Sequence, residues 1–248
     1  MSARRLEGRR VLLTRPAEDA GQWAAEIAAH GAVPDLMPCV RIEPLTDAAT
    51  RDRLGVALRA ADCVVFTSAR GVEAAASLAG AMVVCGVRES AVVGPATAAA
   101  TARVLGVESY VARGGTSRAL GDELVAAWGE RAAGRRVVVV GAAGGRTDAD
   151  DVLSAAGVIV SRVEVYRTLP APPRQHRRDL GGDGVTDVLL ASPSAVTGLL
   201  NQAIVARGVR LYAIGATTAG AIVAAALELT GQATTPDLNG LLEAMKCL

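Results

Sequence analysis

Arg9-Arg10-Val11-Leu12-Leu13 occurs a second time, little changed, as Arg135-Arg136-Val137-Val138-Val139. The two copies lie 126 positions apart (135 − 9 = 126). A short apolar run without polar alternation is typical of a strand covered on both faces of a parallel sheet. We therefore expect the chain to contain the same sheet-forming unit twice.

The repeat extends outward from these strands. Further pairs of segments follow at offsets of 126, 124 and 121: Gly31 and Gly157, Thr67-Ser68-Ala69-Arg70-Gly71-Val72 and Ala191-Ser192-Pro193-Ser194-Ala195-Val196, Gly94-Pro95-Ala96-Thr97-Ala98 and Gly215-Ala216-Thr217-Thr218-Ala219. Such a period is longer than the roughly 20–50 residues of a solenoid repeat. The 248 residues instead fit two domains of about 100–150 residues each. The sequence thus predicts two related lobes that form one ligand-binding cleft.

Short apolar runs alternate with longer Ala-rich runs along both halves. The predicted strands are Arg10–Thr14, Cys63–Phe66, Ala91–Val93, Arg136–Val140, Asp187–Leu190 and Leu211–Ile214. The predicted helices are Asp19–Ala29, Ala69–Leu78, Ala96–Val104, Ser117–Trp128, Ala149–Ala156, Ala195–Ala206, Thr217–Leu229 and Leu238–Met245. This order predicts an α/β protein with a doubly wound parallel sheet in each half.

Two segments at equivalent places in the repeat alternate polar and apolar residues. They are Met37–Pro44, which ends at a proline, and Ser161–Thr168, which has Pro170 two residues beyond it. Such alternation predicts strands with one solvated face, and together they would form a two-stranded hinge between the lobes. Ala171–Gly184 contains several prolines and glycines and is predicted to be a surface loop.

Composition excludes several kinds of site. The 26 basic and 25 acidic residues are balanced, so no nucleic-acid partner is indicated. Lys246 is the only lysine, which argues against Schiff-base chemistry and a Walker A site. The four cysteines have no C-x-x-C spacing, so neither a metal nor a redox cofactor is expected. No signal peptide or membrane span is predicted, and we expect a cytoplasmic protein.

Candidate binding residues follow the ends of the strands. Because ligands of parallel α/β sheets bind outside the carboxyl ends of the strands, hydroxyls and free amides in these turns are suited to anions. Each Ser or Thr could equally be an ordinary helix N-cap. Six such turns together nevertheless predict a ligand with several carboxylates or phosphates. The predicted binding residues are Thr14, Arg15, Ser68, Thr97, Arg146, Ser192, Ser194, Thr217 and Thr218.

Two further features stand out near the second hinge segment. The run Gly141–Thr147 lacks the lysine and glycine spacing of a phosphate loop, although Arg146 within it could bind a carboxylate. Tyr166 breaks the repeat, because its equivalent in the first half is Val40. Its phenol could donate a proton or hydrogen bond, or the ring could simply fill space in the hinge.

Taken together, the segments resemble the uroporphyrinogen-III synthase family. The matching pieces are Leu13-Thr14-Arg15-Pro16, Val65–Val72, Val93–Ala98, Val165-Tyr166-Arg167-Thr168, Ala191–Val196 and Ile214–Ala219. Each is short, but their order and spacing cover almost the whole chain. The family often has Asn where Arg70 stands, so the role of that position does not transfer.

The resemblance implies two flavodoxin-like lobes joined by a two-stranded ladder, with the chain interleaved between them. One lobe would comprise residues 1–35 and 172–248, the other residues 46–159, and the hinge strands 36–45 and 160–171, whereas the repeat alone divides the chain near Glu130. The implied reaction cyclises hydroxymethylbilane with loss of water and inversion of ring D, giving uroporphyrinogen III without a cofactor. Tyr166 would be catalytic, and the strand-end turns would hold the carboxylates.

Two expectations concern partners, and two other functions would fit the same repeat. Because two lobes form a complete cleft, we expect a monomer. Hydroxymethylbilane synthase would supply the substrate, and whether it hands this unstable product over directly stays open. A two-lobed protein that only binds a small anion, or a regulatory module built from flavodoxin-like halves, would show a similar repeat. The regulatory alternative needs acidic residues at the end of the first strand, and Asp62 begins its strand instead.

Overall fold

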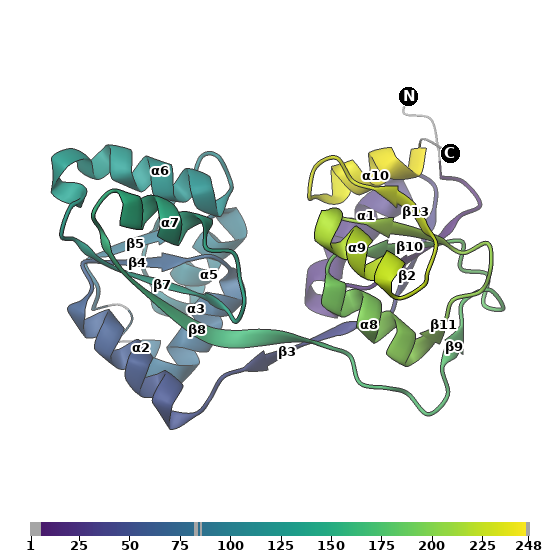
Figure 1. Ribbon diagram of the computed structural model, residues 1–248, viewed down its shortest axis with the longest axis horizontal. Helices are drawn as coiled ribbons and strands as arrows, with labels where there is room; N and C mark the ends of the chain where they lie inside the picture. Colours follow the sequence, from purple (N-terminus) through teal and green to yellow (C-terminus); the bar gives the residue numbers. More distant parts are fainter. Residues whose placement is uncertain (1–5, 82–83, 85, 247–248) are drawn as a thin grey trace. The chain divides into compact units, whose positions relative to one another are not determined.

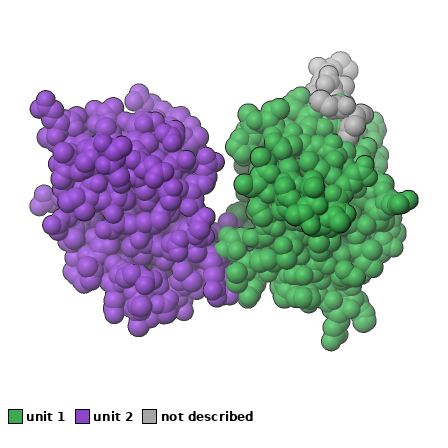
Figure 2. All heavy atoms as spheres, viewed as in Figure 1, with its two compact units in different colours: residues 1–41, 168–248 green, residues 42–167 purple. Residues whose placement is uncertain are grey.

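The computed structural model describes residues 6–81, 84 and 86–246. Cys85 and Cys247, two of the cysteines considered above, lie outside the described residues. The chain divides into two compact units, which Figure 2 distinguishes by colour. Unit 1 comprises Met1–Arg41 and Thr168–Leu248, and unit 2 comprises Ile42–Arg167. Each unit is therefore described separately.

Unit 1 has a five-stranded parallel sheet in the order β13-β12-β10-β1-β2 (Figure 1). The strands are β1 (Arg10–Leu13), β2 (Val33–Leu36), β10 (Asp187–Leu190), β12 (Arg210–Ala213) and β13 (Leu229–Gln232). The helices are α1 (Ala17–Ala29), α8 (Pro193–Gln202), α9 (Ala216–Ala224) and α10 (Leu238–Lys246). One apolar cluster joins the sheet to α1 and α10, and another joins it to α8 and α9. The sheet is thus doubly wound, which accounts for its uniformly apolar strands.

Unit 2 has a six-stranded sheet in the order β3-β8-β7-β4-β5-β6. The strands are β3 (Val40–Pro44), β4 (Cys63–Phe66), β5 (Glu89–Val92), β6 (Tyr110–Val111), β7 (Arg136–Ala142) and β8 (Ile159–Pro170). The helices are α2 (Ala48–Ala60), α3 (Ala69–Ala79), α5 (Pro95–Leu105), α6 (Ser117–Trp128) and α7 (Asp148–Ala155), with a 3-10 turn at Gly129–Ala132. Helices α2, α3 and α5 cover one face of the sheet and α6 and α7 the other (Figure 1), and their apolar side chains form a separate cluster on each face.

The two sheets are related by a permutation of the chain. Strands β1 and β2 of unit 1 precede β10, β12 and β13, and these five lie in the flavodoxin-like order 2-1-3-4-5. In unit 2 the strands equivalent by sequence are β7, β8, β4, β5 and β6, and they lie in that same order. The repeat therefore extends to the sheets, and each unit combines strands from both halves of the chain.

The chain passes between the units twice, and within each unit the two passing segments are hydrogen-bonded to each other. In unit 1 the amide of Ala171 donates to the carbonyl of Cys39 over 2.9 Å, and in unit 2 the amide of Leu45 donates to the carbonyl of Val165 over 2.9 Å. Helix α8 packs so closely here that a Cβ on Gly198 would lie 1.7 Å from the Cys39 carbonyl oxygen. Only glycine fits at this crossing.

Several elements differ from those predicted. The helix predicted to end at Ala206 ends at Gln202, because Ala203–Ile204 forms strand β11 and pairs with β9 (Arg178–Asp179) inside the predicted loop. The helix predicted to reach Leu229 ends at Ala224, since Leu229 begins β13 instead. Strands β2 and β6 and helix α2 were not predicted, because their apolar residues are few or interrupted by polar ones.

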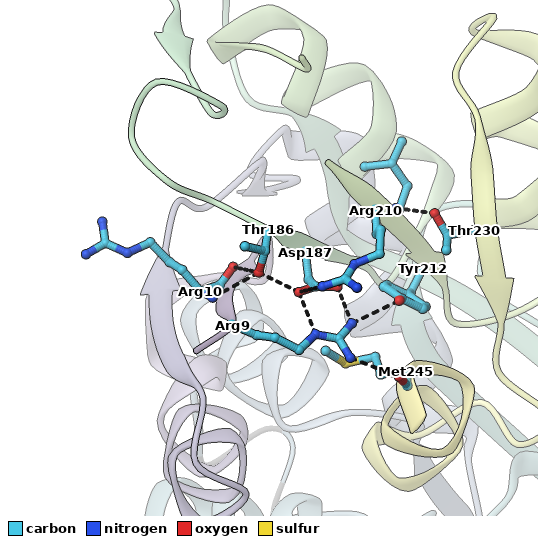
Figure 3. A network of polar contacts seen from close by, with 9 residues as sticks. Arg9, Arg10, Thr186, Asp187, Arg210, Tyr212, Thr230 and Met245 are labelled. Carbon is cyan, nitrogen blue, oxygen red and sulfur yellow. Dashed lines mark hydrogen bonds and ion pairs between the residues drawn. The ribbon is translucent and has the colours of Figure 1, made fainter. Parts of the chain in front are cut away.

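The amino ends of β10 and β12 surround a buried carboxylate (Figure 3). Asp187 is fully buried and accepts hydrogen bonds from Arg9 Nε over 2.8 Å and from Arg210 Nη2 over 3.0 Å. Arg9 also donates to the Tyr212 hydroxyl and to the carbonyl of Met245, which attaches α10 to the sheet. Burial alone would raise the pKa of Asp187, but the hydrogen bonds outweigh it and lower that pKa.

Among the described residues, none of the helices combines the length and apolar character needed to span a membrane.

Candidate functional site

The carboxyl end of each sheet presents a row of helix N-termini. Ser68 begins α3 and its Oγ accepts a hydrogen bond from the amide of Gly71 over 3.1 Å. Ser192 begins α8 and accepts from the amide of Ala195 over 3.2 Å. These serines occupy equivalent positions in the two units, so both predicted binding residues also serve as N-caps. A cap hydroxyl retains a further lone pair and its own proton for a ligand.

Two buried threonines lie one strand farther along. Thr97 and Thr218 are each the third residue of their helices, α5 and α9, and are 6% and 1% exposed. Gly94 and Gly215 precede these helices, and neither supplies a side-chain cap. No side-chain cap covers the first turn of either helix, and the amide of Thr97 donates instead to the carbonyl of Gly94 over 3.1 Å. Such helix ends are suited to carboxylates.

Tyr166 lies beside the N-terminus of α3 in unit 2. Its hydroxyl is 2.9 Å from Ser68 Oγ, and its side chain is 7% exposed. The register of β8 against β7 shifts here, because Gly141 pairs with Glu164 and Ala142 with Tyr166. Val165 is skipped, and both it and Tyr166 enter the same apolar cluster. A phenol at a helix N-terminus can donate a hydrogen bond or a proton to a bound group.

The run Gly141–Thr147, called the Gly141–Thr147 loop below, comprises the last two residues of β7 and the connection to α7. Its amide at Ala143 donates to the carbonyl of Tyr166 over 2.7 Å, and its amide at Gly144 donates to Glu164 Oε1 over 2.8 Å. A Cβ on Gly141 would lie 2.7 Å from Thr67 Oγ1, so the loop begins in close contact with the end of β4. The loop is therefore tied to the strand that contains Tyr166.

The arginines predicted to bind carboxylates have protein partners. The side chain of Arg146 is 80% exposed and forms an ion pair with Asp148 over 2.7 Å. Arg15 lies over the ring of Trp23, 4.2 Å from its centroid, and is 3.9 Å from Asp19. Both guanidiniums are within reach of solvent, so each could exchange its partner for a ligand carboxylate.

The remaining predicted residues differ in accessibility. Thr14 is fully buried and donates to the carbonyl of Leu189 over 2.7 Å, which ties β1 to β10. Thr217 is exposed and Ser194 is partly exposed, both in the first turns of their helices. The structure thus brings Ser192, Thr218 and their neighbours to one edge of unit 1, and Ser68, Thr97 and Tyr166 to one edge of unit 2.

Sequence reasoning missed two residues at this edge, Arg162 and Glu164. Both were assigned to the hinge, yet Arg162 donates to Asp150 over 2.8 Å and Glu164 caps the loop amide of Gly144. Arg162, Glu164 and Tyr166 are spaced two residues apart in a predicted strand. That spacing predicts that the three side chains share a face, which is how the first two could have been found.

The described residues offer little to a metal. No group of three or more His, Cys, Asp or Glu within them could hold a metal ion. Cys39 and Cys63 are free and buried, and burial raises the pKa of each thiol to about 12. Neither thiol is activated as a nucleophile.

Comparisons with known proteins agree on one family. Residues 21–243 match the family described as uroporphyrinogen-III synthase HemD. The crystal structure of uroporphyrinogen-III synthetase from Helicobacter pylori is similar with a TM-score of 0.58 at 14% identity, covering 95% of this chain and 97% of that one. A mutant uroporphyrinogen III synthase from Thermus thermophilus gives a TM-score of 0.54 at 18% identity, covering 96% and 98%. At these identities the two structures establish the fold. No curated protein matches the sequence.

Proposed function

We propose that this chain, which belongs to the uroporphyrinogen-III synthase family, cyclises hydroxymethylbilane to uroporphyrinogen III. The observation that supports this most strongly is the family match, which spans residues 21–243. The reaction removes water and inverts ring D through a spiro intermediate, so the enzyme would be a cyclising lyase. It would act as a cytoplasmic monomer supplied by hydroxymethylbilane synthase.

The chemistry requires control of geometry more than acid or base strength. The pyrrole nitrogen of the bilane can expel the hydroxyl unaided, and the unrearranged macrocycle then forms spontaneously. The protein must hold the substituted carbon of ring D against the ring A methylene. Restraint of this kind can lower a barrier by several kcal/mol.

The helix N-termini of both units are suited to hold the eight carboxylates of the substrate. The amides after Gly94 and Gly215 would bind carboxylates together with Thr97 and Thr218. Main-chain amides bind a carboxylate through directional, charge-assisted hydrogen bonds. Ser68, Ser192, Ser194, Thr217, Arg15 and Arg146 would contribute at the margins of these sites, while Thr14, whose hydroxyl is already bonded within the sheet, would act through the position of its turn.

Tyr166 would assist departure of the hydroxyl or orient ring D. Its hydrogen bond with Ser68 fixes the phenol at the N-terminus of α3. A phenol held there can donate a hydrogen bond or a proton to a departing group. This position is therefore consistent with a proton donor.

The decisive experiment uses freshly prepared hydroxymethylbilane. The purified chain is mixed with it, the products are oxidised, and the porphyrin isomers are separated. We expect the III isomer to predominate, with heat-inactivated protein leaving the spontaneous mixture. An unaltered mixture with the folded protein would refute the proposed function, and equilibrium binding without turnover would favour the anion-binding alternative.

A further inference from the structure

Arg162 joins three parts of unit 2 at the end of β7. Its Nε and Nη2 donate to the two carboxylate oxygens of Asp150 in the first turn of α7, each over 2.8 Å. Nη2 also donates to the backbone carbonyl of Arg146 in the loop. The side chains of Arg162 and Asp150 are only 18% and 13% exposed. A bidentate arginine–carboxylate pair this sheltered has a defined geometry.

The Arg162–Asp150 pair occurs where the helix after the first strand starts later in unit 2 than in unit 1. At the repeat offset of 126, α1 and α7 end at equivalent residues, Ala29 and Ala155. Helix α1 begins at Ala17, whose equivalent is residue 143, but α7 begins only at Asp148. The first turn of the helix is therefore replaced by loop in unit 2, where Gly144 has a φ of +64°. Leu36 stands where unit 2 has Arg162.

The anchored loop lies beside the strand with the proposed catalytic phenol. Its amides bond to the backbone of Tyr166 and to the side chain of Glu164, and its first glycine contacts Thr67. Arg162 lies against that glycine, because a Cβ on Gly141 would be 3.5 Å from Arg162 Nη1. Any movement of the loop would consequently reach the end of β8.

We propose that Arg162 is a positioning residue that fixes the Gly141–Thr147 loop and, through it, the geometry in which ring D closes. The part concerning ring closure rests on the proposed function. Arg162 does not need to touch the substrate, since a displacement of about 1 Å at a distance can reduce a positioned reaction by roughly 100-fold.

The test compares Arg162→Met with Arg178→Met. The control removes a bidentate partner of Asp35 in unit 1, whose two side chains are 24% and 18% exposed. Two properties are measured: amide hydrogen exchange of the peptide covering residues 141–150, and kcat, KM and isomer ratio with hydroxymethylbilane. We expect Arg162→Met to speed exchange and to lower kcat about tenfold with a smaller share of the III isomer. Arg178→Met should change neither property.

Conservative variants separate positioning from general stability. Arg162→Lys keeps the positive charge but cannot form the bidentate pair with Asp150. We therefore expect its rate of amide exchange in the loop and its isomer ratio to lie between those of the wild type and Arg162→Met. If Arg162→Met does not fold, Asp150→Asn removes the charged partner with little change in shape and is judged by the same properties.

The results distinguish this inference from the proposed function. Loop exchange and isomer ratios that match between Arg162→Met and Arg178→Met would overturn it, as would faster exchange without any change in isomers. If the wild-type chain itself forms no excess of the III isomer, the proposed function fails, and amide exchange alone then decides whether Arg162 holds the loop.

Discussion

Units 1 and 2 share a strand order but differ in what occupies the amino ends of their strands. In unit 1 the buried Asp187 lies between two guanidiniums, those of Arg9 and Arg210. At the equivalent position of unit 2 (187 − 124 = 63) stands Cys63, a buried thiol without charge. The same point in the fold therefore accepts an ionic cluster or a small apolar side chain.

The arginine equivalent to Arg9 finds its partner nearer the surface in unit 2. Arg135 pairs with Glu89 over 2.6 Å, and the carboxylate side chain is 44% exposed. The guanidinium also lies over the ring of Trp128, 4.5 Å from its centroid. An exposed pair contributes about 0–1 kcal/mol, whereas breaking a buried one is far more damaging.

At the carboxyl ends of the strands, unit 2 has the larger set of polar contacts. In unit 1, Thr14 is satisfied within the sheet and a short turn leads directly into α1. In unit 2 a longer glycine-rich loop is anchored by Arg162, and Tyr166 lies beside it. Unit 1 has its largest polar cluster at the amino ends of its strands, away from the proposed site. Unit 2 has its own at the carboxyl ends, beside Tyr166. Two units with the same strand order can therefore carry a stabilising ionic cluster in one and a polar loop beside the proposed site in the other.

The largest effect is expected from Asp187→Ala. Removing the carboxylate leaves Arg9 and Arg210 without their buried partner, so the free energy of unfolding should fall by about 3–5 kcal/mol. Cys63→Ala, at the equivalent position, should lower it by about 1 kcal/mol. Urea denaturation followed by circular dichroism measures both. Equal losses would mean that the ionic cluster is not what distinguishes the units.

A change at the other edge should affect activity instead. Tyr166→Phe removes the hydroxyl that bonds to Ser68, and we expect kcat/KM to fall about 100-fold, the lower range for loss of a positioned acid. Tyr110→Phe is the matched control, because it removes a hydroxyl that bonds to Glu123 elsewhere in unit 2. Full activity and an unchanged isomer ratio in Tyr166→Phe would remove this residue from the mechanism.

The paired threonines test whether both units bind carboxylates. Thr218→Val and Thr97→Val keep the side-chain shape but remove a hydroxyl, and each should raise KM about tenfold through loss of a hydrogen bond to a charged group. Thr101→Val serves as a control, since its buried hydroxyl bonds to the carbonyl of Ala98 within α5. A rise in KM for only one of the paired variants would assign substrate binding to a single unit.

The smallest expected effect is on the stability of the folded protein at acid pH. The pKa of Asp187 is lowered in the folded protein, so its contribution to stability is complete well above the unfolded value of about 3.9 and is lost as pH falls from near that value through the folded value. Between pH 5 and about pH 3.5 the wild type should therefore lose slightly more stability than Asp187→Ala. Urea midpoints at these pH values measure the difference, and parallel curves would contradict it.

Much of the fold follows from local pattern. The predictions of a parallel α/β fold and of the resemblance to the uroporphyrinogen-III synthase family are confirmed. Cys63–Phe66, Asp187–Leu190 and Ser117–Trp128 were predicted with their observed ends. The errors occur where tertiary pairing overrides propensity, as at Ala203–Ile204, whose alanine and isoleucine continue a helical pattern but pair with β9. The binding roles of the strand-end residues remain predictions.

The presence of two similar units can be read from the sequence, because uninterrupted apolar strands and capped helices are properties of neighbouring residues. Which strands share a sheet and where Tyr166 points depend on pairing between distant segments. Alternation alone would assign Val165 and Tyr166 to opposite faces of β8, yet the register shift against β7 places both in one cluster. That shift depends on contacts between segments far apart in the chain, which no local pattern contains.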